Sequence, residues 1–165
     1  MLRELSTLFL RELDALRREV ELYPTDAAVW SEIPGVPNPA GTLVLHLVGN
    51  LRYFIGGTLG RTGYVRDREA EFSVRDTPRS ELLHLIAVAR SEVADAMRVL
   101  EPSTLPAQFP VAVRGISLPT ELFLLHLLSH LGYHLGQIDY HRRASTGNSA
   151  SANALPIKAL SVSRS

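Results

Sequence analysis

The chain has 165 residues, of which 45% are hydrophobic and 21% are charged, and these values are ordinary for one globular domain. Its 17 basic and 17 acidic residues cancel, so the composition offers no basic surface of the kind that binds nucleic acid. The chain contains no cysteine, which excludes disulfides, thiolate zinc sites and a cysteine nucleophile. Any metal site must therefore use histidine, carboxylates or water.

The N-terminal segment is amphipathic and carries charges throughout. It has neither the uncharged apolar stretch nor the small-residue cleavage site of a signal peptide. No apolar run in the sequence is long enough to span a membrane. We therefore expect a cytoplasmic protein that binds neither membranes nor nucleic acid.

The first predicted helix spans residues 2–22. Leucine, phenylalanine and valine recur there every three or four positions, with arginine and glutamate between them. This spacing is typical of an amphipathic helix. Pro24 ends the pattern, and the proline-rich segment that follows, up to Asn38, is predicted to be a loop.

The second predicted helix begins with Asn38 as its N-cap and Pro39 at its first position, where the missing N–H of proline is no loss. It ends at the glycines near Gly60. The segment 61–76 is polar and charged, and is predicted to be a connection on the surface.

Thr77 is predicted to cap the third helix, which carries an apolar stripe and stops at Pro102. Apolar residues then alternate on either side of Arg114 and Gly115. This alternation around a turn predicts a small β-hairpin between the third and fourth helices.

The fourth predicted helix begins near Pro119 and ends at Gly147, since glycine is common just past helix ends. Four long helices with apolar stripes indicate an all-α fold, a four-helix bundle, which we assign to residues 1–147. Residues 148–165 are mostly small and polar, and are expected to form a loosely held C-terminal tail.

Four of the six histidines lie between positions 126 and 141, in the fourth predicted helix. His126, His130 and His134 follow one another at intervals of four, so they share a helix face and two neighbours can bind one ion. All three cannot, because the helix axis advances by about 12 Å from the first to the third. Either pair therefore needs a third ligand from another helix.

Two histidines lie outside the fourth helix. His46 stands between leucines in the second helix and faces the core or a cleft, whereas His84 shares a face with Glu81 and is expected to point outward. The pattern favours His46 as the third ligand. The alternative, that these histidines are hydrogen-bonded core residues without a metal, has about equal support from the pattern alone.

Two segments carry a resemblance to a known family: LVLHLVGNLRYFIG in the second helix and HLLSHLGYHLGQIDYHRR in the fourth. They resemble the DinB/YfiT-like family of metalloproteins, and the HxxxHxGQI portion from His130 to Ile138 is the most distinctive part. The resemblance covers residues 2–147 and includes the lead PVAVRGISLPTELFLLH into the fourth helix. It implies an up-down-down-up bundle, often a homodimer. It also implies a divalent ion, typically nickel or zinc, bound by His46, His130 and His134.

Three further residues are expected near this ion, as hydrogen-bond partners of its ligands or in the cleft beside it: Asn50, His126 and Gln137. Asn50 and Gln137 each lie about one turn from a ligand. His126 lines the cleft or simply packs. His141 is expected at the surface, and His84 is expected to be structural.

Three neutral imidazoles leave positions on the ion for water or substrate. The resemblance implies S-transferases and isomerases that use small thiols such as bacillithiol or mycothiol, so we expect a metal-dependent S-transferase with a small-molecule substrate. One alternative is a metal-hydroxide hydrolase, although the sequence lacks the glutamate of an HExxH motif. The others are a non-catalytic dimeric metal-binding or stress-related module, and a plain bundle without metal.

Overall fold

The computed structural model describes residues 1–154 and 156–160, and within these ranges the fold is all-α, as the sequence predicts. The long elements are α1 (Leu2–Glu21), α3 (Ala40–Leu51) with its π-helical continuation η1 (Arg52–Leu59), α5 (Arg79–Val99) and α6 (Thr120–Thr146). The short elements are α2 (Asp26–Val29), α4 (Arg68–Ser73), η2 (Pro102–Thr104) and η3 (Ile157–Leu160).

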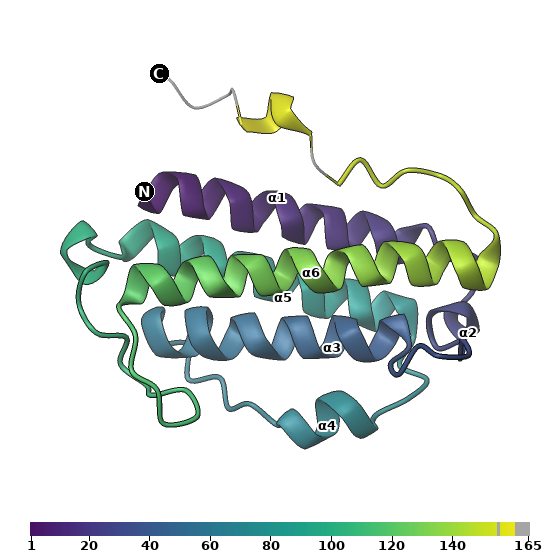
Figure 1. Ribbon diagram of the computed structural model, residues 1–165, viewed down its shortest axis with the longest axis horizontal. Helices are drawn as coiled ribbons and strands as arrows, with labels where there is room; N and C mark the ends of the chain where they lie inside the picture. The colour runs from purple at the N-terminus through teal and green to yellow at the C-terminus, as the bar shows by residue number, and fades with distance from the viewer. Residues whose placement is uncertain (155, 161–165) are drawn as a thin grey trace.

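The four long segments lie side by side (Figure 1). Both α1 and α3 pack against α5 and α6, and α4 packs on α3. The helices α1 and α6 run in one direction, and α3 and α5 run in the other (Figure 1). None of the described helices is long and apolar enough to cross a membrane.

One apolar core fills the space between these segments. The inward stripe of α1 consists of Leu5, Phe9, Leu13, Leu16 and Val20, each at most 1% exposed. Burying a side chain of this size contributes about 1.5–3 kcal/mol relative to leaving it in water. The apolar stripes therefore determine which faces of the helices meet, and hence which polar residues face one another.

Proline sets the start of three long helices. Pro39, Pro78 and Pro119 stand immediately before α3, α5 and α6, and none of these helices has a side-chain capping bond. The predicted caps at Asn38 and Thr77 therefore lie one residue too early. Gly147 has φ of +70° directly after α6, the left-handed conformation that glycine adopts readily.

The predicted surface connection 61–76 contains a helix that the polar composition did not predict. Asp67 caps α4, because its carboxylate accepts a hydrogen bond from the Ala70 N–H at 2.9 Å. The helix packs on α3 (Figure 1) and brings side chains of this connection to the histidines described below.

The chain reverses at Arg114 and Gly115, where a hairpin is predicted. Two backbone hydrogen bonds of 2.9 and 3.0 Å join Val113 to Ile116 across the turn, and both turn residues have positive φ. Only isolated bridges, not strands, occur in the described part of the chain. The reversal is therefore where the pattern places it, but without extended arms.

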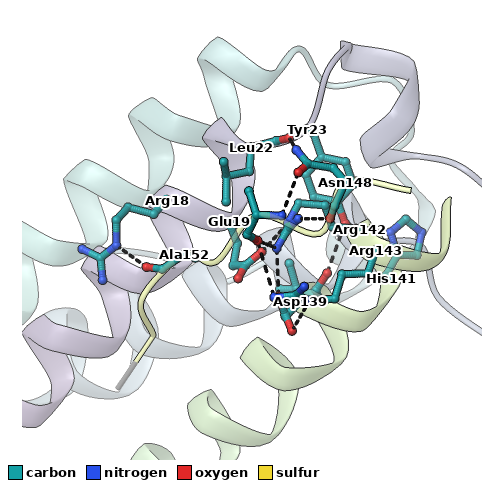
Figure 2. A network of polar contacts seen from close by, with 12 residues as sticks. Arg18, Glu19, Leu22, Tyr23, Asp139, His141, Arg142, Arg143, Asn148 and Ala152 are labelled. Carbon is teal, nitrogen blue, oxygen red and sulfur yellow. Dashed lines mark hydrogen bonds and ion pairs between the residues drawn. The ribbon is translucent and has the colours of Figure 1, made fainter. Parts of the chain in front are cut away.

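Hydrogen bonds join the chain after α6 to the helices over residues 148–153, where the sequence predicts a loosely held tail. Arg142 is fully buried, and it donates hydrogen bonds to the carbonyls of Asn148 (2.6 Å) and Ala150 (2.8 Å) as well as to Glu19 of α1 (2.6 Å). Figure 2 shows this network, in which Arg18 also reaches the carbonyl of Ala152. Positions 155 and 161–165 of the predicted tail lie outside the described residues.

Candidate metal centre

Three histidines from two helices converge where α3 faces α6. One ring nitrogen from each of His46, His130 and His134 lies within 4.8 Å of the others, and these are the three residues predicted as ligands. The Nε2 atoms of His46 and His130 are 3.2 Å apart. Two imidazole nitrogens on one tetrahedral zinc ion lie about 3.3 Å apart, given bonds of about 2.0–2.1 Å. The spacing of this pair therefore matches a shared ion, and the nitrogen of His134 lies within 4.8 Å of both.

Helix geometry selects these three rings. His130 and His134 are one turn apart on α6, with ring centroids 4.6 Å from each other, and His46 reaches across from α3 to within 5.1 and 5.4 Å of them. His126 lies one turn before His130 on α6. Its ring stacks on that of His130 with the centroids 6.3 Å apart, and its side chain is exposed. Only one neighbouring pair on α6 meets the third ring, as the helical rise requires.

Burial keeps the rings on α6 unprotonated. Burial, together with the neighbouring His134 and His46, lowers the pKa of His130 to about 4. Burial also lowers the pKa of His134, although its hydrogen bond to Gln137 opposes the shift. Both imidazoles are therefore neutral near pH 7 and offer a lone pair to a cation.

The outer nitrogen of His46 is held by a carboxylate from α4. Its Nδ1 lies 2.9 Å from Oε2 of Glu71, which is 6% exposed. Arg66 donates to both oxygens of this carboxylate, at 2.6 and 2.7 Å. Burial alone would raise the pKa of Glu71, but the bonds from Arg66 and His46 bring it below its ordinary value. An ionised Glu71 accepts a hydrogen bond from the Nδ1–H of His46. The lone pair of His46 is then on Nε2, which faces the other two rings.

A glycine makes room for this carboxylate. Gly49 lies three residues after His46 on α3, and a side chain there would collide with the carboxylate of Glu71. The close approach of α4 to α3 thus depends on a position without a Cβ. Sequence reasoning missed Glu71, Arg66 and Gly49, because their roles depend on how α4 packs. An Asp67 cap followed by acidic residues could have revealed α4 itself, but not its partner.

The predicted partners of the ligands have different outcomes. Gln137 lies on His134, with its Oε1 2.6 Å from Nδ1. Asn50 makes no hydrogen bond to His46, whose Nδ1 is already bonded to Glu71, and its amide has no hydrogen-bond partner among the described residues. Asn50 instead lines a cavity beside the histidines.

Two cavities adjoin the three histidines. The first, of about 660 Å³, is lined by His46, His126, His130, Asn50 and the arginines Arg66, Arg68 and Arg114, and we call it the arginine-lined cavity. The second, of about 530 Å³, is lined by His134, Gln137, Tyr133, Tyr140 and the loop around Val36. A third, of about 550 Å³, lies between α1 and α6 and has no histidine in its lining.

The other two histidines lie away from the cluster. His84 is exposed, as its position beside Glu81 predicts. His141, expected at the surface, is 3% exposed, because the end of α6 packs against the connection after α1. Its Nε2 donates to the carbonyl of Ser31 (2.9 Å), and its Nδ1 accepts from the Tyr23 hydroxyl (2.7 Å). Burial lowers the pKa of His141, so it is a neutral structural residue.

The sequence profile of the DinB superfamily matches residues 8–138, a range that includes all three converging histidines and most of the chain. Neither the comparison with curated proteins nor the comparison with solved structures yields a match. On the extent of the profile match, the chain belongs to the DinB superfamily.

Proposed function

We propose that this protein is a metal-dependent S-transferase. His46, His130 and His134 hold a divalent ion, zinc or nickel, at which a low-molecular-weight thiol is activated as the cosubstrate. The observation that carries the proposal is the convergence of three imidazoles beside a cavity of about 660 Å³. A bound divalent ion would supply Lewis acidity, which lowers the pKa of a thiol and favours the thiolate at neutral pH.

The donor set fits such an ion. Imidazole suits both zinc and nickel, and the lowered pKa values of His130 and His134 keep their rings free of protons that would compete with the ion. Glu71 and Gln137 hold the outer nitrogens of His46 and His134, which fixes the orientation of both rings. Three protein ligands leave room for a substrate, as in catalytic sites.

The surroundings favour thiol chemistry over hydrolysis. No aspartate or glutamate is among the described residues that line the arginine-lined cavity, so His126 is the one group in that described lining, outside the proposed ligands, that could act as a general base for water. A thiol needs no such base once it is ionised. Because the chain has no cysteine, the sulfur comes from a small molecule. A cytoplasmic location, where small thiols are kept reduced, belongs to the same proposal.

We also propose that the long helices form a four-helix bundle of up-down-down-up topology over residues 1–147, with a small hairpin before α6. The opposite directions of α1 and α6 relative to α3 and α5 support this topology (Figure 1). We further propose a homodimer with its contact near the start of α6, where Leu122 and Leu125 are 49% and 44% exposed. Light scattering tests the dimer.

Metal content is the first test. Untagged protein purified without added metal is expected to carry about one divalent ion per chain, and His130→Ala to lose it. Zinc or nickel is expected to raise the melting temperature of the metal-free protein, because a ligand that binds only the folded state stabilises it. His84→Ala, which removes an exposed histidine outside the site, is the matched control and is expected to retain the ion.

Activity is the second test. In the cobalt-substituted protein a thiol is expected to change the visible spectrum, and an electrophile added afterwards is expected to be consumed with formation of a thioether. If no thiol changes the spectrum, the result would favour the hydrolase or a non-catalytic metal-binding or stress-related module. If the purified protein carries no metal and added metal does not raise its melting temperature, the protein would be a plain helical bundle.

A further inference from the structure

We propose that the arginine-lined cavity binds the anionic end of the thiol cosubstrate, a carboxylate or a phosphate, through Arg68 and Arg114, with Asn50 contacting a hydrogen-bond donor of the same molecule. This inference rests on the proposed function and names the chemical class of its substrate.

The cavity has an uncompensated positive charge. Of its three arginines, Arg66 is neutralised by the carboxylate of Glu71. Arg68 and Arg114 form no ion pair with any residue that the structure describes; Arg68 lies over the ring of Phe72 at 5.0 Å. Arg114 is exposed at the tip of the turn between Val113 and Ile116. Arg68 belongs to α4 and Arg114 to this turn, and neither has an acidic partner among the described residues. Two such arginines in one cavity favour an anionic ligand between them.

A second observation points into the same cavity. Asn50 is 8% exposed, it lines the cavity, and its Oδ1 has no hydrogen-bond partner among the described residues. It lies one turn beyond His46 on α3, and it lines the same cavity as His46 and His130. Buried amide oxygens are rarely left without a donor. Because Asn50 lines the cavity, a rotation of its amide would turn the oxygen toward an N–H or O–H of a ligand there.

The neighbouring cavity provides the contrast. It adjoins His134, but its described lining contains no arginine, lysine, aspartate or glutamate and is dominated by apolar residues and the rings of Tyr133 and Tyr140. An anion gains no countercharge there. The arginine-lined cavity, at about 660 Å³, is also within the range of volumes that hold small ligands. The charge therefore assigns the anionic molecule to one side of the three histidines.

The test uses pairs of thiols that differ only in charge. Mercaptoalkanoates of increasing length and hydroxyl-terminated thiols of the same lengths are titrated into the cobalt-substituted protein, with the visible spectrum as the readout. At low salt the best carboxylate is expected to bind about tenfold more tightly than its hydroxyl partner. This preference should shrink as salt is added, because the arginines are open to solvent.

Variants locate the preference. Arg68→Gln and Arg114→Gln are each expected to reduce it several-fold, and the double variant to abolish it while leaving the affinity for hydroxyl thiols unchanged. Arg98→Gln is the matched control, since Arg98 is an exposed arginine on α5 outside the cavity lining, and it is expected to retain the preference.

A second pair of probes tests Asn50. N-acetylcysteine carries an amide N–H beside its thiol, and 3-mercaptopropionate carries none. Asn50→Leu is expected to weaken binding of N-acetylcysteine several-fold and to leave 3-mercaptopropionate unaffected. Metal content measured on each variant separates loss of the ion from loss of the ligand contact.

The outcomes distinguish the two proposals. Equal affinity for charged and uncharged thiols would overturn the anionic substrate and leave the S-transferase proposal intact. A preference that survives in the double arginine variant would likewise overturn it. Silence toward every thiol, with cobalt bound, would overturn both.

Discussion

The carboxylate of Glu71 fixes the orientation of the His46 ring, and a single substitution at Glu71 tests this role. Glu71→Gln keeps the shape of the side chain but removes its negative charge. That charge strengthens the hydrogen bond from the Nδ1–H of His46 and pairs with Arg66. Removing such partners of metal ligands typically lowers affinity by about 10- to 100-fold. We expect this loss for zinc, measured by competition with a chromophoric chelator.

The control for this substitution lies on the same helix. Glu69→Gln changes an exposed glutamate of α4, two positions away, and is expected to leave zinc affinity unchanged. If Glu71→Gln bound zinc as tightly as Glu69→Gln, the carboxylate would be a structural partner of Arg66 without influence on the ion.

The lowered histidine pKa values predict how the metal-free protein responds to acid. The pKa of His130 falls to about 4 in the folded chain from an ordinary 6.5, so the unfolded chain binds more protons between these two values. The free energy of unfolding therefore decreases as pH falls through this window. Between pH 7.5 and pH 5 we expect His130 to account for a loss of about 1–2 kcal/mol, measured by urea unfolding.

The variant His130→Gln isolates this contribution, because glutamine does not titrate. Its unfolding free energy is expected to change less over the same pH range than that of the parent chain. A parent protein whose stability is flat between the two pH values would contradict the proposed burial of a neutral ring.

Residue spacing explains which parts of the site the sequence predicts. The pair His130 and His134, and the contact of Gln137 with His134, follow from helical intervals of four and three. Glu71 is 25 positions from His46, and no local interval predicts that contact. Asn50 has the right interval for His46, but the ring nitrogen it would bind is already occupied.

At the scale of elements, the centre depends on how closely α4 approaches α3. Gly49→Ala would normally stabilise a helix by about 1 kcal/mol, but here the added methyl group meets the carboxylate of Glu71, which Arg66 holds in place. We expect a roughly tenfold loss of zinc affinity, by analogy with loss of the partner carboxylate itself. Titration with the chromophoric chelator measures it.

Gly132→Ala is the matched substitution on α6. A Cβ at Gly132 meets open space, so the change is expected to raise the free energy of unfolding by about 0.5–1 kcal/mol and to leave zinc affinity alone. Unchanged affinity in both variants would mean that Glu71 accommodates the methyl group without moving His46.

The long elements are predictable from sequence because each carries a strong local signal. Apolar spacing gives the bodies of α1, α5 and α6, and proline or glycine gives their ends within a residue or so. The short helix α4 lacks an apolar stripe and forms against α3, so its polar composition resembles a loop. The turn at Arg114 is likewise visible, whereas the extent of pairing around it depends on tertiary packing.

At the scale of the whole molecule, one buried cation joins three distant parts of the chain. Arg142 of α6 pairs with Glu19 of α1 at 2.6 Å, both almost fully buried, and binds Asp139 and the carbonyls that follow α6 (Figure 2). Burial raises the pKa of Glu19 even beside this guanidinium. The packing of α1 on α6 thus includes a buried ion pair, and removal of one partner would leave the other charge buried alone.

Arg142→Met leaves Glu19 buried without its cation and removes the donors to the segment after α6. Breaking a buried pair from one side typically costs about 3–5 kcal/mol, and we expect a loss of that size in urea unfolding. Arg143→Gln, which removes a partly exposed arginine bound to the same Asp139, is expected to cost much less, because solvent screens an exposed ion pair. The double variant Glu19→Gln, Arg142→Met should recover part of the loss, because no charge is then left buried. If Arg142→Met cost as little as Arg143→Gln, the buried ion pair would contribute little, and apolar packing would hold α1 against α6.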